Sequence, residues 1–384
     1  TKAGPFSPVN YQVITTLGSI GSTTRTDLRG MQGNLSEKYV LGADITATGS
    51  WTSIGSSAAN SFKGFFDGLG HSISSLYMSS SQCFFGYTDG ATIQNVNLIN
   101  PNLTGYQYLG SLIGSAKNSN INNVSVITNN TTSTIGGNKY VGGLVGKLEG
   151  GTITNSSIIG STITVSNSVA GGLVGELAGG TITNSYVVNT KIGNTARIGG
   201  LVGDIVGITG STIENSYFQG TLTGSSGLIG GLVGYIDNTN VSYTPEINIK
   251  QSYAVATIDG IGLIGGLVGS LKTNWVTLKF TDSFWDKEIS GVSSSTGSSS
   301  TTGISGTATG KTTSEMQEKE TFINSNWIMT EFGKNAYKYP RLTMNNGVNA
   351  WVINIPPTAV NYTFSSLSGN TYTYKADVYS LSDY

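Results

Sequence analysis

The chain has 384 residues, of which 37% are hydrophobic and only 11% are charged, and its formal net charge is −1. This balance excludes the basic surface that nucleic-acid binding requires. No apolar run approaches the roughly 20 residues of a membrane span, so membrane insertion is not expected. The single cysteine, Cys83, rules out an internal disulfide.

Glycine is abundant, with 54 residues against only 7 prolines, and Val, Ile and Thr recur between the glycines. Short β-branched segments separated by glycine are typical of short strands joined by tight turns. Because the glycines follow no three-residue period, collagen is excluded. The composition therefore predicts an all-β protein.

In chain order, residues 1–45 contain alternating segments, 11–14 and 38–45, which we assign to strands that open or cap the fold. Residues 46–288 form the repeat region. Its glycine motif, Gly-Gly-Leu-Val-Gly, has complete copies beginning at Gly142, Gly171, Gly199, Gly230 and Gly265, and weaker copies beginning at Gly110 and Gln82. Successive copies start 28 to 35 residues apart.

A second motif, Thr-Ile-x-Asn-Ser, follows the first in constant phase at 92–96, 120–124, 152–156, 181–185, 212–216, 248–252 and 279–283. Two motifs in phase indicate stacked structural repeats. The spacing predicts a right-handed parallel β-helix with three-strand coils, because each strand then pairs with its equivalent one coil away. A β-propeller is the main alternative, but its blades need roughly 40–50 residues.

Stacked coils place equivalent side chains in columns along the axis. Three inner or bend columns are expected: Leu144, Leu173, Leu201, Leu232 and Leu267; Ile93, Ile121, Ile153, Ile182, Ile213 and Ile249; and an amide ladder of Asn95, Asn123, Asn155, Asn184 and Asn215, continued by Gln251 and Asp282. The glycines are expected where φ is positive or where coils approach closely. Tyr186, Tyr217, Tyr253 and Phe284 share one position, either as an outward aromatic strip or, as we favour, as a structural stack that faces inward into the core.

Beyond the repeats, residues 289–345 are assigned to a loop and a capping segment. The Ser/Thr/Gly tract 289–310 predicts a mobile loop, and Ser314 with Gln317 forms a capping-box pattern that predicts a helix over 314–322. Such a helix would cover the open end of the solenoid. Residues 346–384 contain further strands, which are either additional coils or a separate small domain.

The paired motifs resemble the GLUG repeat of bacterial surface and secreted proteins. Residues 62–73 resemble the coil that precedes such arrays, and Phe284-Trp285-Asp286 with 310–317 resembles their usual end. The combination, over roughly residues 11–343, is similar to filamentous-haemagglutinin-like adhesins of the two-partner secretion pathway, including the high-molecular-weight adhesins of Haemophilus. Because GLUG repeats also occur in surface peptidases, the resemblance fixes fold better than function.

The resemblance implies a secreted or cell-surface location, export through an outer-membrane secretion partner, and attachment to host-cell glycans, often sialylated. It also implies glycosylation of Asn in Asn-x-Ser/Thr triplets, which occur here at Asn34, Asn102, Asn123, Asn129, Asn130, Asn155, Asn240 and Asn361. We expect a monomer.

Ligand-binding residues are expected in insertions, because loops carry function on a rigid scaffold. The longest predicted insertions are 115–139, 235–250 and 272–288. Their candidate ligand-binding residues are Asn118, Asn120, Asn130 and Tyr140 for the first, Tyr235, Asp237, Asn238, Asn240 and Tyr243 for the second, and Lys272, Asn274 and Trp275 for the third. Trp51, Tyr106 and Tyr108 are further surface candidates.

Catalysis is not predicted. Glu149, Glu176 and Asp204 share a phase after the glycine motif, but we interpret them as a solvated rim, since no neighbouring pattern explains split pKa values. His71 has no second His or Cys nearby, so neither a metal nor a cofactor is expected. The sequence thus favours a glycan-binding adhesin segment. The alternatives are a structural stalk and, third, a polysaccharide-active enzyme.

Overall fold

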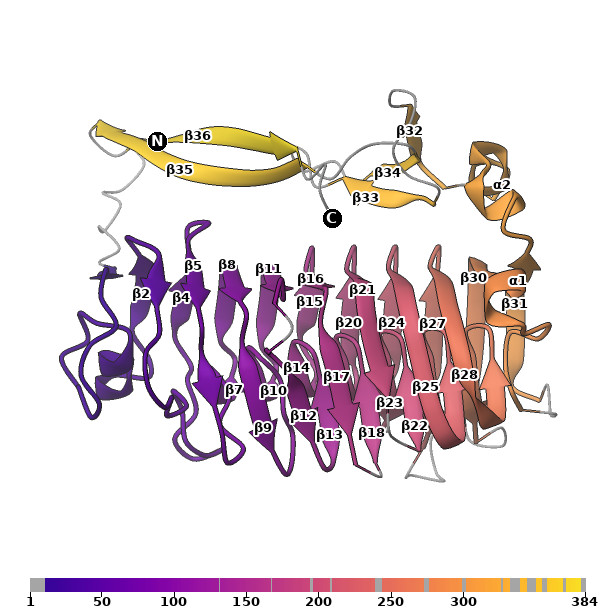
Figure 1. Ribbon diagram of the computed structural model, residues 1–384, viewed down its shortest axis with the longest axis horizontal. Helices are drawn as coiled ribbons and strands as arrows, with labels where there is room; N and C mark the ends of the chain where they lie inside the picture. The colour runs from indigo at the N-terminus through magenta and orange to yellow at the C-terminus, as the bar shows by residue number, and fades with distance from the viewer. Residues whose placement is uncertain are drawn as a thin grey trace, which may run out of the picture.

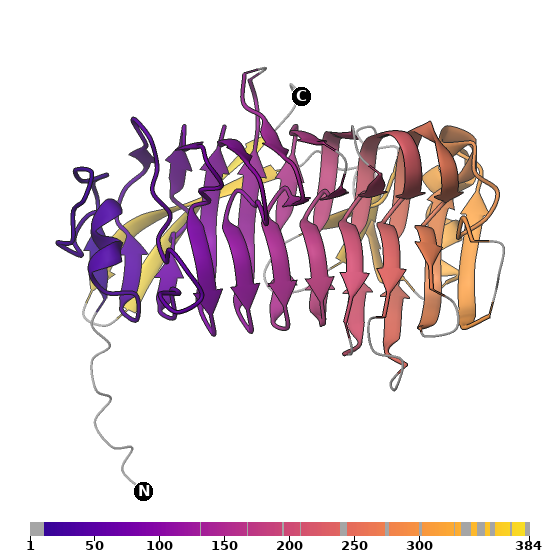
Figure 2. The ribbon, with the colours of Figure 1, turned by 90° about the horizontal axis from the view of Figure 1, so that it is seen from below.

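The computed structural model describes residues 11–130, 132–166, 168–193, 196–207, 209–238, 244–272, 276–298, 302–325, 327–331, 339–343, 350–353, 358–368 and 371–380. The predicted parallel β-helix is confirmed: successive coils stack along the long axis, and their equivalent strands pair in parallel (Figures 1 and 2). In the described residues these strands form a 24-stranded and a 7-stranded sheet.

The 7-stranded sheet receives one strand from each of seven successive coils: β7 (Phe85–Asp89), β10 (Ile113–Lys117), β14 (Val145–Glu149), β19 (Val174–Ala178), β23 (Val202–Val206), β26 (Val233–Asp237) and β29 (Val268–Leu271). The 24-stranded sheet contains β1 (Gln12–Ile14), β2 (Lys38–Leu41), β3 (Ile45–Thr46), β4 (Phe65–Asp67), β5 (Ser72–Ser74), β6 (Tyr77–Met78), β8 (Thr92–Ile99), β9 (Asn102–Gly105), β11 (Asn120–Ile127), β12 (Ile135–Gly137), β13 (Tyr140–Gly142), β15 (Thr152–Thr154), β16 (Ser157–Ile159), β17 (Thr162–Val165), β18 (Val169–Gly171), β20 (Gly180–Thr183), β21 (Tyr186–Gly193), β22 (Arg197–Gly199), β24 (Ser211–Glu214), β25 (Tyr217–Gly230), β27 (Glu246–Lys250), β28 (Tyr253–Gly265), β30 (Thr277–Asp286) and β31 (Ile304–Lys311).

The first strands already belong to the solenoid. β1 pairs with β2 and β2 pairs with β4, all in parallel, and a short 3-10 helix (Arg29–Gly33) lies between β1 and β2. At the other end β31 pairs with β30, so the ladder extends beyond residue 288. Among the described residues, β32 (Met329–Glu331), β33 (Arg341–Thr343) and β34 (Ala350–Ile353) form a separate sheet, and β35 (Thr358–Ser368) pairs with β36 (Thr371–Ser380) as a hairpin.

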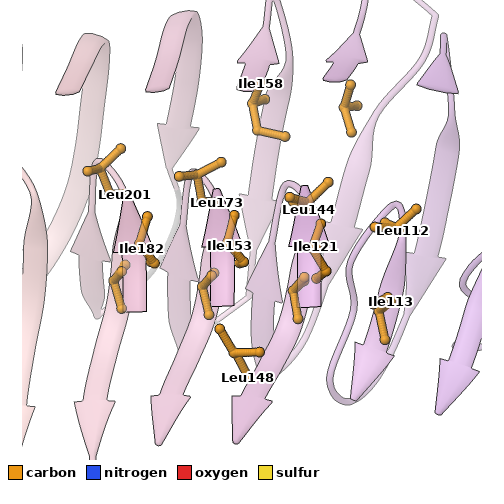
Figure 3. Packing of buried hydrophobic residues seen from close by; sticks show 14 of the residues in the cluster. Leu112, Ile113, Ile121, Leu144, Leu148, Ile153, Ile158, Leu173, Ile182 and Leu201 are labelled. Carbon is orange, nitrogen blue, oxygen red and sulfur yellow. The ribbon is translucent and has the colours of Figure 1, made fainter. Parts of the chain in front are cut away.

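The predicted apolar columns fill the inside of the coils. Every residue of the leucine and isoleucine columns has an exposed fraction of 0%, and Figure 3 shows Leu144, Leu173 and Leu201 in one row and Ile121, Ile153 and Ile182 in another. Strand register confirms the alignment, since Ile153 pairs with Ile121 on one side and Ile182 on the other. Burying branched aliphatic chains in this way supplies the main stabilising term of the rod.

The bend after each isoleucine is confirmed, but the continuous amide ladder is not. All five column asparagines have positive φ, from 47° to 54°, and Gln251 and Asp282 keep this conformation. Asn123 Nδ2 donates to Asn95 Oδ1 at 2.8 Å, whereas Asn155 Nδ2 donates to Asn122 Oδ1 at 2.9 Å. The column residues are therefore selected chiefly for the left-handed backbone, which asparagine tolerates better than most residues.

The serine after each bend forms the buried ladder instead. The hydroxyl of Ser185 donates to the carbonyl of Thr183 at 2.9 Å and accepts from the backbone N–H of Ser156, one coil away, at 3.1 Å. The same pattern joins Ser156, Ser185, Ser216, Ser252 and Ser283, all with exposed fractions of 0%. Each buried hydroxyl is satisfied as both donor and acceptor.

The glycines of the motif allow close approach of neighbouring coils. A Cβ on Gly172 would overlap the carbonyl oxygen of Gly200 and lie 2.8 Å from Val187 Cγ2. The φ of Gly172 is not positive, so close packing and not backbone conformation selects glycine here.

Three expectations about loops and caps are wrong. Segments 115–139, 235–250 and 272–288 contain β11, β27 and β30, because their Asn-rich stretches are copies of the second motif. The tract 289–310 contains β31 and a bridge from Thr296 to Val268. Trp51 is 3% exposed and belongs to the core.

The capping helix is also different from its prediction. It is split into a 3-10 turn (Glu315–Gln317) and α2 (Lys319–Ile323). Ser314 makes no capping hydrogen bond; the backbone N–H of Thr312 donates to Glu315 Oε2 at 2.7 Å, and Glu315 N–H donates back to Thr312 Oγ1 at 3.2 Å. This reciprocal pair is a capping box shifted by two residues.

α2 packs on the side of the solenoid and not across its end. Tyr186, Tyr217 and Tyr253 stack with ring centroids 5.1 and 4.9 Å apart. The expected inward orientation of these rings is wrong: they face outward, because the residues that directly follow them, Val187, Phe218 and Ala254, belong to the inner core. Phe322 and Trp327 cover this column, with centroids 5.5 and 5.8 Å from Phe284. We call the covering residues, 312–325, 327–331 and 339–343, the clasp.

Asp286 connects the clasp to the last coils. It is fully buried. Its Oδ1 accepts from the backbone N–H groups of Glu288 and Ile289 in α1 (Lys287–Ser290) and from Thr313 Oγ1 at 3.1 Å. Its Oδ2 accepts from the Tyr339 hydroxyl at 3.0 Å. The carboxylate of Asp286 thus fixes the N-terminus of α1 and two residues of the clasp, Thr313 and Tyr339.

We predict that Gly172→Ala lowers the free energy of unfolding by about 1–3 kcal/mol, because the coils must separate to admit the methyl group. The control is Gly136→Ala, where the nearest atom to the new Cβ is Thr164 Oγ1 at 3.3 Å. Denaturant titration followed by circular dichroism measures both. Equal midpoints for the two variants would contradict close packing as the reason for the motif glycine.

We predict that Asp286→Ala releases the clasp, because its donors lose a buried acceptor at a cost of roughly 1–3 kcal/mol. Proteolysis within residues 319–325 should accelerate, while the circular dichroism of the solenoid stays unchanged. Asp286→Asn keeps an acceptor oxygen and should show a smaller effect. Unchanged cleavage in Asp286→Ala would show that the aromatic contacts and the remaining hydrogen bonds, such as that from Trp327 Nε1 to the Asp282 carbonyl, hold the clasp without Asp286.

Candidate functional site

The last glycine of each motif creates a tight external corner. A Cβ on Gly175 would lie 2.8 Å from the backbone nitrogen of Val141 in the preceding coil. The residue two positions before the motif and the residue directly after it therefore point outward on either side of this corner. These residues form two columns, which we call the corner band: Tyr108, Tyr140, Val169, Arg197, Leu228 and Leu263 on one side, and Ser115, Lys147, Glu176, Asp204, Tyr235 and Ser270 on the other.

Charged side chains occupy the middle of the corner band. Lys147 Nζ lies 3.1 Å from Glu176 Oε1 and 3.6 Å from Glu149 Oε2. Arg197 Nη1 lies 2.6 Å from Asp204 Oδ2. Glu176 is 6% exposed and Asp204 only 1%, so the solvated-rim interpretation of these two carboxylates is wrong. Glu149 lies in a different column, opposite Lys117 and Ala178.

Burial determines the electrostatics of Asp204. Desolvation raises the pKa of its carboxyl group to about 6, against the opposing effect of Arg197 and with a further rise from Glu176 and Asp237. The Oδ1 atom is buried without a hydrogen-bond partner among the described residues. A carboxylate held in this way binds a proton more readily than one in water.

Tyrosine rings flank the charged centre. Tyr108 and Tyr140 stack with centroids 5.2 Å apart and planes 13° apart, and Lys147 Nζ lies 5.6 Å from the centre of the Tyr108 ring. On the other side the Arg197 guanidinium lies 4.9 Å from the centre of the Tyr235 ring. Such cation–π contacts hold the rings in fixed orientations on the rigid sheet.

Several predicted ligand-binding residues meet at the end of the corner band. Tyr235 belongs to it, and Asp237 lies two residues later in the same strand, where its Oδ1 is 3.4 Å from Lys272 Nζ. Asn238 is fully buried, so its side chain does not reach the surface as expected. Asn240, Tyr243, Asn274 and Trp275 lie outside the described residues.

The structure adds Lys147 and Arg197, which the sequence reasoning did not select as binding residues, and it places Tyr140, a candidate from the first insertion, in the same corner band. Their signal was their spacing: each lies at a fixed distance before or after the glycine motif, and the pairs Tyr140 with Lys147 and Arg197 with Asp204 are separated by the same interval. Loops were searched for binding residues, whereas the motif's own flanks carry the charges.

The candidate glycosylation sites differ in accessibility. Asn129 and Asn130 are exposed, and Asn129 accepts a hydrogen bond from Asn100 Nδ2 at 2.7 Å. Asn123 and Asn155 use their side-chain amides in the hydrogen bonds at the bends. Asn34 Nδ2 donates to Glu37 at 3.2 Å, and Asn102 lies in the strand β9. Asn240 lies outside the described residues, as does the side chain of Asn361. Modification stays a prediction, best placed at Asn129 or Asn130.

Within the described ranges, no group of three or more His, Cys, Asp or Glu side chains is arranged to hold a metal ion. His71 Nδ1 instead lies 3.3 Å from Asp44 Oδ1, and Cys83 is buried in the core. No described helix has the length and apolar character to cross a membrane.

Comparison with known proteins supports the repeat assignment. Residues 137–164 match the GLUG motif. The matched stretch contains Tyr140 and Lys147 of the corner band and Asn155 of the bend. No curated protein sequence matches the chain.

Two solved structures align with this chain. A structure named IgA1 Protease aligns with a TM-score of 0.52 and 21% identity over 70% of this chain, and this chain spans only 21% of that protein's length. A second, described as a "putative immunoglobulin A1 protease from Bacteroides ovatus", aligns with a TM-score of 0.49 and 23% identity over 84% of this chain and 88% of that one. At this identity the first likeness shows the β-helical fold alone.

We predict that Asp204 makes the chain less stable as the pH rises from about 4 to 7. Its pKa is raised in the folded state, so the folded state binds the proton more tightly than the unfolded state, and this contribution is lost as the pH passes about 6. The free energy of unfolding should fall by up to roughly 3 kcal/mol through this group. Denaturant titrations of wild type and Asp204→Asn at several pH values measure the difference.

The variant should gain stability relative to wild type across that interval. Glu149→Gln, at a side chain that is 51% exposed, is the control and should follow the wild-type curve. A constant difference between Asp204→Asn and wild type from pH 4 to pH 7 would contradict a raised pKa.

Proposed function

We propose that this chain is a β-helical segment of a secreted or surface-exposed bacterial protein that attaches to host-cell glycans through the corner band, without catalysis. The observation that carries this is the concentration of tyrosine rings and charged groups along one corner of a surface otherwise rich in Ser, Thr and Asn. Rings offer apolar faces to sugars, and the charged groups offer strong hydrogen-bond donors and acceptors.

The shape of the corner band suits an extended polymer. Neighbouring coils are spaced by roughly 4.8 Å, and a pyranose unit advances a polysaccharide by a similar distance. Successive sugars would therefore meet equivalent positions of successive coils, from Tyr108 and Tyr140 at one end to Tyr235 at the other. Lys147 provides a cation for acidic sugars, including sialylated ones.

The state of the carboxylates supports a non-catalytic role. A general acid must reach the leaving group of its substrate. Asp204 Oδ1 has almost no accessible surface, and Oδ2 is paired with Arg197. Glu176 is held by Lys147. The proposal extends to export through an outer-membrane secretion partner and to a monomeric segment.

A stalk or spacer is the second candidate. It is favoured by the mutual pairing of the charged groups, since Lys147 and Arg197 already contact carboxylates of this chain. In that case the corner band stabilises the rod, and a different part of the protein contacts the host.

We predict that Tyr140→Ala and Tyr235→Ala each weaken retention of host glycans on an array by about 3- to 10-fold, since losing one ring contact costs about 0.5–1.5 kcal/mol. Tyr106→Ala is the control, because Tyr106 is 59% exposed but lies outside the corner band. The two corner-band variants and the control are each tested on sialylated and on neutral glycans.

If wild type retains no glycan above background, the spacer replaces the adhesin. If Tyr106→Ala loses binding and the corner-band variants do not, the glycan site lies elsewhere on the surface. Release of shorter saccharides from a polysaccharide by wild type would contradict the absence of catalysis.

A further inference from the structure

A broad, open cleft of about 610 Å³ lies between the solenoid and the clasp. Small-molecule sites typically enclose roughly 300–1,000 Å³. One wall is the outer face of β21, β25 and β28, and the opposite wall comes from α1 and the clasp. The cleft is separate from the corner band, whose charged column lies on the 7-stranded sheet.

The polar lining is rich in groups that both donate and accept hydrogen bonds. Side-chain amides come from Asn189, Gln219 and Gln317, and hydroxyl groups come from threonines that include Thr221 and Thr257. Among the described lining residues there is no carboxylate and Lys191 is the only cation. This chemistry disfavours a divalent metal ion, which needs several carboxylates, and a polyphosphate, which needs several cations.

Apolar surface completes the lining. Val255 on β28 is 6% exposed, Tyr339 on the clasp is 8% exposed, and Ile289 on α1 is 42% exposed. A ligand that matches both parts of the lining has an apolar ring face and a rim of hydroxyl groups. Those are the properties of a pyranose sugar, whose hydroxyls pair with amides and whose C–H face packs on apolar side chains.

The clasp side of the cleft is held in place in advance. Thr313 and Tyr339 both line the cleft, and both donate to the buried carboxylate of Asp286. Binding groups whose positions are already fixed lose little conformational entropy when a ligand arrives. The same arrangement means that a ligand in the cleft would contact solenoid and clasp together.

We propose that this cleft is a second binding site, which takes a short neutral saccharide and stabilises the clasp against the solenoid. The proposal does not rest on the glycan-binding function of the corner band, because it uses different residues on a different face.

The experiment is saturation-transfer NMR with lactose, cellobiose and N-acetylglucosamine as probes. Thr257 and Thr162 occupy the same column. Thr162 pairs with Lys191, Lys191 pairs with Thr221, and Thr221 pairs with Thr257. Both threonines are exposed, but only Thr257 lines the cleft. Thr257→Trp should therefore fill the cleft and weaken binding at least 10-fold, whereas Thr162→Trp should bind as wild type does.

Gln219→Ala is a second, smaller variant that also should weaken binding, in case the tryptophan perturbs the fold. The bound sugar should slow proteolysis within residues 319–325 of the clasp. No saturation transfer from the protein to any of the three sugars, or equal transfer in Thr257→Trp and Thr162→Trp, would overturn the proposal. Tyr140→Ala should keep full transfer at the cleft, which separates failure here from failure at the corner band.

Discussion

Every part of this molecule is constrained by the contact of each side chain with its own equivalent one coil away. In a parallel ladder that distance is roughly 4.8 Å, so a residue is tolerated inside only if it packs or bonds with the residue at the equivalent position of the next coil. Leucine and isoleucine satisfy this by packing. Serine satisfies it because its hydroxyl donates within its own coil and accepts from the next. A column of like charges would repel itself. Charged columns therefore lie outside, and where their side chains are most buried the charges alternate in sign, as in the contact of Lys147 with Glu176. Glu176 opposite Asp204 is the exception, and the cations Lys147 and Arg197 lie on its two sides.

Periodicity was sufficient to predict the fold because the constraint is one-dimensional. Once two motifs keep a constant phase, parallel pairing and the inner columns follow without knowledge of any long-range contact. The same reasoning misjudged asparagine, which it treated as a hydrogen-bonding residue, while the structure uses its tolerance of positive φ. It also passed over the serine beside it. Both residues are small and polar, and both Asn184 and Ser185 are buried, so only the positive φ of the asparagine and the hydrogen bonds of the serine hydroxyl distinguish their roles.

The candidate site was harder to predict because its residues flank the glycine motif and are not part of its repeated sequence. Glu176 and Asp204 follow a glycine and read as surface residues in sequence. They are buried because that glycine brings the preceding coil's backbone within van der Waals contact, so the neighbouring columns cover them. The feature that builds the rod thus also desolvates its outer charges. Sequence alone gives the spacing of Arg197 and Asp204 but not the depth of the corner between them.

The outer aromatic column distinguishes one region of the otherwise repetitive solenoid from the rest. Along this column the first coils carry Ser72, Asn97, Ser125 and Ser157, and the last carry Tyr186, Tyr217, Tyr253 and Phe284. Uncovered, four stacked rings would form an apolar strip on a polar surface. The change from hydroxyl and amide to ring coincides with the coils that the clasp covers, and Asp286 fixes the clasp there by hydrogen bonds that stacking alone does not provide. The docking place of the C-terminal segment is therefore encoded at an outward-facing position of the repeat, where the inner core does not restrict the residue type.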